Sequence, residues 1–222
     1  MRTLALLPLL PLLGCAASRG HTPVPAGQVA WTASLGGPVV EYFDGLKPLP
    51  LSALGGAYGV DGRTTVHGAI LPTGLALFGV LGLEGGASHL LWEGESSRLM
   101  ADGSLWVFAG PHNGAASIDY DPAPGGLRVF PEGQLLWARD LGPHTVYAGA
   151  SLFVQPWPDP TALPAPLLGA EVRLGRLGLQ PELSWVEAWK DNEPYSPQFL
   201  GVSGHGALSL RLGLTLHPGG GR

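Results

Sequence analysis

The chain has 222 residues, a formal net charge of −5 and a mean hydropathy of +0.20, with 35 Gly, 22 Pro and only 13% charged residues. An apolar content of 45% excludes a disordered chain, because disordered chains bury too little apolar surface to fold. The 12 basic residues are never adjacent and are outnumbered by 17 acidic ones, so no nucleic-acid partner is predicted. The single cysteine excludes a disulfide scaffold and a cysteine-based zinc cluster.

Residues 1–14 have the layout of an export signal. Arg2 precedes an apolar run that ends in small residues. The run is shorter than the roughly 20 apolar residues that a membrane-spanning helix needs, and Pro8 and Pro11 disfavour a long helix. The sequence therefore predicts a signal peptide over residues 1–14.

The apolar run ends in Leu12-Leu13-Gly14-Cys15, which resembles the lipobox of bacterial lipoproteins. The resemblance implies that the signal is cut before Cys15, that this cysteine is lipidated, and that membrane lipid is its partner. Ala16, in a position where Asp favours the inner membrane, implies the outer membrane as the destination. The alternative is an ordinary signal peptide cut at Ala16-Ala17-Ser18, with a chance cysteine before it.

Residues 15–50 are predicted to form the lipidated N-terminus, a tether and an entry segment. Pro and Gly punctuate this stretch, and no periodicity is visible apart from a possible short strand at 38–43. The barrel-like body is predicted over 51–216, with a tail at 217–222.

From residue 51 the pattern has a period of two, as in β-strands. Between Leu208 and Leu216 every even position is Leu and every odd position is small or polar, which places the two sets on opposite faces of a strand. Similar runs predict about ten strands, at 51–60, 63–71, 79–92, 104–110, 115–120, 127–139, 144–155, 166–174, 177–189 and 205–216.

Turns and loops alternate in length along the second half of the chain. The connections at 140–143 and 175–176 are short, whereas 156–165 and 190–204 are long. Outer-membrane barrels have short turns on the periplasmic side and longer loops outside. Asp61-Gly62 and Asp102-Gly103 are predicted hairpin turns. With an even strand count, Asp61-Gly62 would be an unusually tight loop on the outer side.

The body over 51–216 resembles small bacterial outer-membrane β-barrel proteins. The resemblance implies an all-β fold, an antiparallel up-and-down barrel of 8–10 strands, whose wall also meets membrane lipid. Trp92, Trp106, Trp137, Trp185 and Trp189 lie on or near predicted strands and suit an aromatic belt. The last strand ends in Leu216 rather than the aromatic residue usual in such barrels. The alternative is a soluble, lipid-tethered β-sandwich or lipocalin-like barrel in the periplasm.

If the Leu rows face lipid, the opposite rows face the barrel interior. A barrel of this size is narrow, so side chains are expected to fill it and opposite charges to pair within it. A plugged interior is therefore predicted in preference to a conducting pore. The predicted interior side chains are Tyr147, Gln155, Glu171, Arg173, Gln180, Glu182 and Arg211.

No motif for a metal, a cofactor or a nucleophile elbow is present in the sequence. The seven histidines lack metal-ligand spacing, so neither a metal nor a cofactor is predicted. Barrel enzymes that cut lipids place a His and a Ser on one face of a strand. The nearest such set here is Ser203, His205 and Ser209, all on the odd face. A row of polar lumen side chains is the preferred interpretation of this set.

The sequence therefore predicts an outer-membrane lipoprotein without catalytic activity, with a role in envelope structure, surface binding or small-solute passage. One alternative is a soluble periplasmic domain that binds a hydrophobic ligand. The other is a lipid-modifying barrel enzyme.

Overall fold

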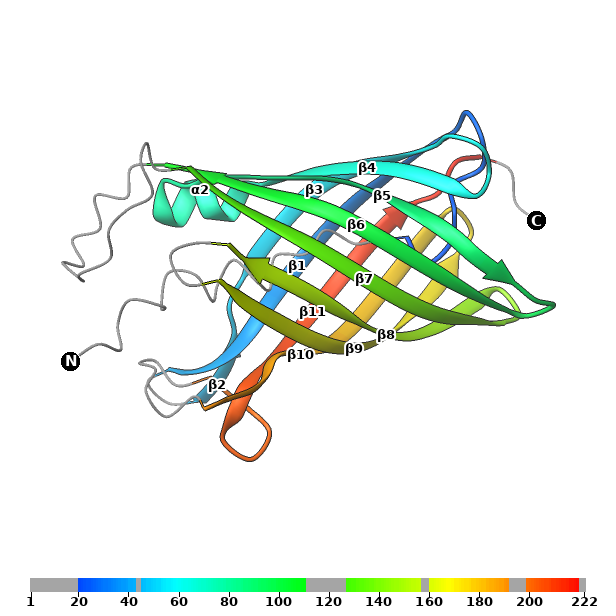
Figure 1. The fold of residues 1–222 in the computed structure, drawn as a ribbon. Helices are drawn as coiled ribbons and strands as arrows, with labels where there is room; N and C mark the ends of the chain where they lie inside the picture. The colour runs from blue at the N-terminus through cyan, green and yellow to red at the C-terminus, as the bar shows by residue number, and fades with distance from the viewer. Residues whose placement is uncertain (1–19, 43–44, 111–126, 157–159, 192–198, 220–222) are drawn as a thin grey trace.

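The computed structural model describes residues 20–42, 45–110, 127–156, 160–191 and 199–219. They form a closed antiparallel β-barrel (Figure 1). Consecutive strands are neighbours in the sheet from β3 to β11. The elements are β1 (Val29–Tyr42), β2 (Gly45–Pro48), β3 (Leu51–Gly59), β4 (Thr64–Leu71), α2 (Pro72–Phe78), β5 (Leu81–Glu93), β6 (Ser97–Ala109), β7 (Leu127–Leu141), β8 (His144–Gln155), β9 (Thr161–Leu174), β10 (Leu177–Asp191) and β11 (His205–Leu216).

The first and last long strands close the barrel. β1 pairs with β11 from Trp31↔Leu216 to Pro38↔Ser209, and its other edge pairs with β3. The short strand β2 pairs with the far end of β1 alone, so ten strands make the ring. The predicted all-β, antiparallel up-and-down barrel is confirmed.

Strand alternation decides which face is the wall and which is the lumen. On β11 the even-numbered leucines from Leu210 to Leu216 are 40–48% exposed, whereas Ser209 and Thr215 are buried inside the ring. Period-two side chains on a closed sheet must divide in this way between outside and inside. The charged side chains of the ring strands point inward or lie near a strand end.

The two ends of the barrel differ. Tight turns at 60–63, 94–96, 142–143 and 175–176 lie at one end, together with the start of β1 and the end of β11. The connections at the other end include β2 and the helix α2, which appear at the left of Figure 1. Pro72 begins α2, and Gly79 ends it in a left-handed conformation. Among the described residues, no helix is both long and apolar enough to cross a membrane.

The prediction for residues 15–50 was wrong in one respect, because the barrel begins at Val29 rather than at residue 51. β1 lacks a clean alternation, since small residues such as Gly36 and Gly37 interrupt it. The predicted exception at Asp61-Gly62 disappears as well. Four strands of the ring, β4 to β7, lie between this turn and the one at 142–143, and an even number places the two turns at the same end.

Asp102-Gly103 is not a turn but lies in the middle of β6, so that prediction was wrong. Both residues pair with strands on either side, and Asp102 is held inside by His67 and Ser104. β6 and β9 also begin earlier than predicted, at Ser97 and Thr161. The strand predicted at 115–120 lies outside the described residues.

Only some of the tryptophans predicted for an aromatic belt face outward. Trp92, Trp137 and Trp189 are exposed on the wall, but Trp106 is fully buried in the lumen. Trp185 is partly covered and donates its indole N–H to the backbone carbonyl of His205 at 2.9 Å.

Because β1 and β11 close the ring, the stability of the barrel is expected to be sensitive to substitution of Gly36. This residue has a φ of 141°, and a Cβ built there would lie 2.1 Å from the carbonyl oxygen of Leu210 on β11. Gly36→Ala is expected to destabilise the barrel by at least about 2 kcal/mol, because the strained backbone and the clash both act on the closing ladder. Urea unfolding in detergent, followed by tryptophan fluorescence, measures the change.

Gly85→Ala is the matched control, because nothing lies within 4 Å of a Cβ built on that outward glycine. Equal stability of the two variants would contradict the account of closure.

Candidate functional site

The candidate site is the barrel lumen, which has an apolar half and a polar half. The apolar half lies toward the end with α2, where β3 begins and β4 ends. The polar half lies toward the tight turns and contains the buried ionisable side chains.

A cluster of aromatic rings fills the apolar half. The ring of Trp106 lies 5.8 Å from that of Phe153 and 6.4 Å from that of Phe108, whose ring is 5.8 Å from that of Phe130. The indole N–H of Trp106 donates to Glu132 at 2.8 Å, which satisfies its one polar atom. The cluster is completed by Leu51, Leu71 and Leu163. These close-packed side chains block the lumen near the α2 end.

Glu182 is the centre of a hydrogen-bonded network in the middle of the lumen. It accepts hydrogen bonds from Arg211 at 2.5 Å and from the hydroxyl of Tyr147 at 3.1 Å, and the Arg211 and Glu182 side chains are both buried. The three residues come from β11, β10 and β8. A buried carboxylate needs such partners, because leaving it unpaired in a low-dielectric interior is costly.

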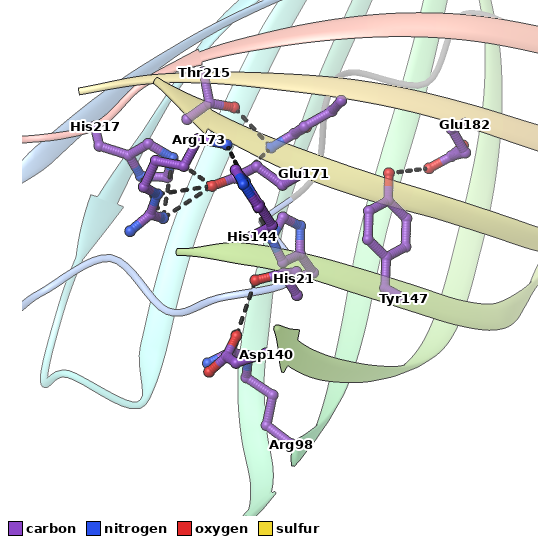
Figure 2. A network of polar contacts seen from close by, with 12 residues as sticks. His21, Arg98, Asp140, His144, Tyr147, Glu171, Arg173, Glu182, Thr215 and His217 are labelled. Carbon is purple, nitrogen blue, oxygen red and sulfur yellow. Dashed lines mark hydrogen bonds and ion pairs between the residues drawn. The ribbon is translucent and has the colours of Figure 1, made fainter. Parts of the chain in front are cut away.

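A second network centres on Glu171, which lies nearer the tight-turn end than Glu182 does (Figure 2). This carboxylate accepts from Arg173 Nε at 3.0 Å, from Gln180 Nε2 at 2.9 Å and from His217 Nε2 at 3.1 Å. His217 follows β11, so the start of the predicted tail also takes part. On the other side of the lumen, Arg98 forms an ion pair with Asp140.

An N-terminal strap, residues 20–28, crosses into this polar half. Its His21 is 1% exposed and stacks on Tyr147, with ring centroids 4.9 Å apart and planes 9° apart. His21 Nε2 lies 3.3 Å from Glu171. Farther along, the backbone N–H of Val24 donates to Thr65 Oγ1 at 2.9 Å. Burial lowers the pKa of His21 to about 4, against an opposing effect of Glu171, so the ring is neutral near pH 7.

A cavity of about 50 Å³ remains beneath the strap, lined by His21, His67, Glu171, Gln180 and His217 among others. A space of this size holds a few water molecules and no larger ligand. Within the described ranges, no group of His, Cys, Asp and Glu is arranged to hold a metal ion.

His67, Asp102 and Ser104 form a hydrogen-bonded chain on the lumen wall. His67 lies 2.7 Å from one Asp102 oxygen, and the Ser104 hydroxyl donates to the other at 2.8 Å. A nucleophilic serine must give its proton to the imidazole, whereas here the carboxylate lies between them. The arrangement therefore fits a structural link between β4 and β6.

The structure places six of the seven predicted interior side chains in the lumen networks, namely Tyr147, Glu171, Arg173, Gln180, Glu182 and Arg211. The side chain of Gln155 lies outside the described part, as does Cys15.

Ser203, His205 and Ser209 are not brought together, contrary to the predicted shared face. Gly206 has a φ of 64°, which interrupts the alternation between His205 and Ser209. His205 is exposed and its Nδ1 lies 2.9 Å from the backbone carbonyl of Ser203, whereas Ser209 is buried in the lumen.

Sequence reasoning missed His21, Arg98, Trp106 and Glu132 as lumen residues. Trp106 and Glu132 stand at inward positions of paired strands, so alternation could have identified them once β6 and β7 were correctly bounded. No pattern in the sequence indicates that His21 lies within the barrel.

The geometry thus defines the protein as a closed, filled, antiparallel β-barrel. No family model matches the chain, and no curated protein matches it either. Among solved structures, the chain is similar to the translocator domain of the autotransporter NalP from Neisseria meningitidis, with a TM-score of 0.35 and 13% identity over 86% of this chain and 88% of that one. A similarity at this level does not bear on function.

The Glu182 network predicts that the stability of the barrel depends strongly on the pairing of Glu182 with Arg211. Arg211→Met leaves the Glu182 carboxylate without its cation and is expected to cost about 3–5 kcal/mol of unfolding free energy. Adding Glu182→Gln should restore most of this loss, because the double variant has no unpaired charge at this position. Urea titrations of the single and double variants measure both effects, and additive losses would contradict the pairing.

Proposed function

We propose that this protein is an outer-membrane lipoprotein whose barrel spans the membrane and whose role is non-catalytic, as an envelope structural or surface-binding protein. The observation that carries the proposal is the apolar outer wall. Every strand of the ring exposes large hydrophobic side chains, among them Trp31, Leu54, Ile70, Leu83, Leu105, Leu135, Leu152, Leu168, Leu183 and Leu212.

Such a wall is unfavourable in water. Each exposed leucine forgoes about 1.5–3 kcal/mol of burial free energy, and soluble monomers rarely expose contiguous apolar patches beyond a few hundred Å². A soluble ligand-binding barrel would show the opposite arrangement, with a polar exterior and an open apolar interior. The hydrocarbon core of a membrane is the environment that this wall fits.

Exposed aromatic residues support the same placement. Trp31, Tyr58, Trp92 and Trp137 are exposed and lie toward the tight-turn end, and Trp189 is exposed near the opposite end of β10. Aromatic side chains favour the two membrane–water interfaces, where the ring is apolar and the polar atom meets water.

The tight-turn end suits the periplasmic side, where such barrels have short turns. Cys15 is six positions before His21, a reach of up to about 20 Å. His21 contacts Glu171, which lies three residues before the end of β9, about 10 Å along the strand. A lipid on Cys15 can therefore enter the adjoining leaflet.

The filled lumen favours a structural or surface-binding role over solute passage. The aromatic cluster blocks one half, and the charged networks and the strap occupy the other. Ser104 donates to the Asp102 carboxylate rather than to His67, and Ser209 is buried while His205 is exposed, so neither set supports a hydrolase.

Membrane insertion without the lipid is the main test. A Cys15→Ala variant, exported by a cleavable signal, is expected to stay in the outer-membrane pellet after alkaline carbonate extraction, because the wall itself holds it there. Immunoblots of pellet and supernatant give the fraction retained. Release into the soluble fraction would overturn the spanning barrel.

A charged substitution on the outer wall, compared with the same charge placed outside the barrel strands, tests whether the wall contacts lipid. Leu212→Arg adds a cation to the middle of β11 and is expected to cost about 2–4 kcal/mol of stability in lipid vesicles. Gln28→Arg adds the same charge at an exposed position before β1 and should have little effect.

The filled lumen also predicts that the protein does not conduct ions. Reconstituted protein at pH 7.5 should give no steady ion conductance in planar lipid bilayers, because the buried side chains of the aromatic cluster occupy the lumen near the α2 end. Trp106→Ala with Phe153→Ala removes two of its rings and tests whether the cluster forms the barrier. Steady ohmic conductance of the unmodified protein would support the solute-passage alternative instead.

A further inference from the structure

The N-terminal strap enters the lumen without being part of the barrel sheet, which raises the question of what holds it there. We propose that the strap is an acid-sensitive latch, in which neutral His21 holds residues 20–25 inside the lumen and protonation of His21 releases them toward the tight-turn mouth. The inference concerns the lumen alone and stands independently of whether the outer wall meets lipid.

His21 fits its position as an uncharged ring. It is 1% exposed and lies flat against Tyr147, and neither ring nitrogen has a hydrogen-bond partner in the described structure. The 3.3 Å approach to Glu171 does not have hydrogen-bond geometry. The ring is therefore held by stacking and burial, both of which favour the neutral form.

The charged groups around His21 act in both directions. Arg98, Arg173 and His217 disfavour a proton on the ring, whereas Glu171 favours one. Glu171 and Arg173 of β9, Arg98 of β6, Tyr147 of β8 and His217 beyond β11 face the ring, and His67 of β4 lines the same cavity.

Glu171, which lies next to His21, already accepts hydrogen bonds from Arg173, Gln180 and His217. Glu171 therefore shares its attraction for a proton on His21 with these partners, and burial, the larger effect, still favours the neutral ring.

The direction of the effect follows from proton linkage. Once released into water, His21 titrates near its ordinary pKa of about 6.5, whereas burial lowers the pKa of the docked ring to about 4. Between these values the released strap binds more protons than the docked strap. Docking of the strap in the lumen is therefore strongest above about pH 6.5 and weakens progressively as the pH falls toward 4.

The remaining strap contacts allow such a movement. The base of the strap is fixed at the rim by backbone hydrogen bonds between Gly27 and Gly59 at 2.8 Å and between Gly59 and Gln28 at 3.0 Å. Gly27 has a φ of 74° and open space around it, which suits a hinge. Beyond this hinge, Val24 bonds to Thr65 and His21 packs in the lumen.

Cysteine accessibility tests the latch. Val24→Cys in a Cys15→Ser chain, folded in detergent, is labelled with a thiosulfonate reagent at pH 7.5 and 5.0, and its rate is divided by that of Glu95→Cys on the exposed turn. This ratio removes the intrinsic pH dependence of the thiol. The two pKa values predict a rise in the ratio of about 30-fold at pH 5.0.

Two variants assign the rise to His21. His21→Phe retains a flat ring for stacking on Tyr147 but cannot titrate, so its ratio should change less than about 3-fold. His89→Phe removes an exposed histidine of β5 and should retain the full rise. A ratio that does not depend on pH in the parent chain, or a full rise in His21→Phe, overturns the latch.

A lumen cysteine separates release from unfolding. Ser151 is buried on the inward face of β8, so Ser151→Cys should remain unlabelled at pH 5.0 while Val24→Cys reacts. Parallel labelling of both positions would mean that acid opens the barrel as a whole, and the latch would be rejected. If His21→Phe does not fold, His21→Gln takes its place and carries the same expectation.

Discussion

The hydrogen-bonded ladder between β1 and β11 is the interaction on which the rest of the structure depends. An open sheet with the period-two pattern of this chain would expose two unpaired edges and one unpartnered face. Closure pairs the edges with each other and gives the two faces different environments. The leucine rows then form the outer wall, and every charged side chain in the middle of a strand must find its partner inside a narrow ring.

That enclosure explains why three arginines of the lumen each lie beside a carboxylate. Arg211 lies beside Glu182, Arg98 beside Asp140, and Arg173 beside Glu171, each pair joining different strands or neighbouring inward positions. A single unmatched charge in such a space would be costly. The neutral ring of His21 is accepted among these pairs because it adds no charge. In the aromatic half, Glu132 accepts from Trp106, and the buried Glu84 lies opposite Trp106 on the neighbouring strand. The apolar outer wall and the paired charges of the lumen both follow from one alternating pattern.

Much of the fold could be predicted from the sequence, because alternation is a local property. The bounds of β8 and β11 follow directly from it, and the inward rows of β9 and β10 contain the residues that form the Glu171 and Glu182 networks. β1 was largely missed, since its glycines weaken the pattern and only its pairing with β3 and β11 makes it a strand. Asp102-Gly103 suggested a turn because local turn preference says nothing about His67 and Ser104, which hold Asp102 inside. His21 depends on contacts with β8 and β9 far along the chain, and no local signal identifies it.

The pairing of Trp31 with Leu216 has a consequence for how the chain folds. The two strands that seal the ring are separated by nearly the whole sequence, so the contact with the greatest loop-closure entropy forms last and folding is expected to be slow. Until then β1 and β11 are bare edges that any other strand can extend, which is the situation that leads to aggregation. A chain of this design therefore needs its two ends kept apart from other chains during assembly, and the slowest step of its maturation is the meeting of its first strand with its last.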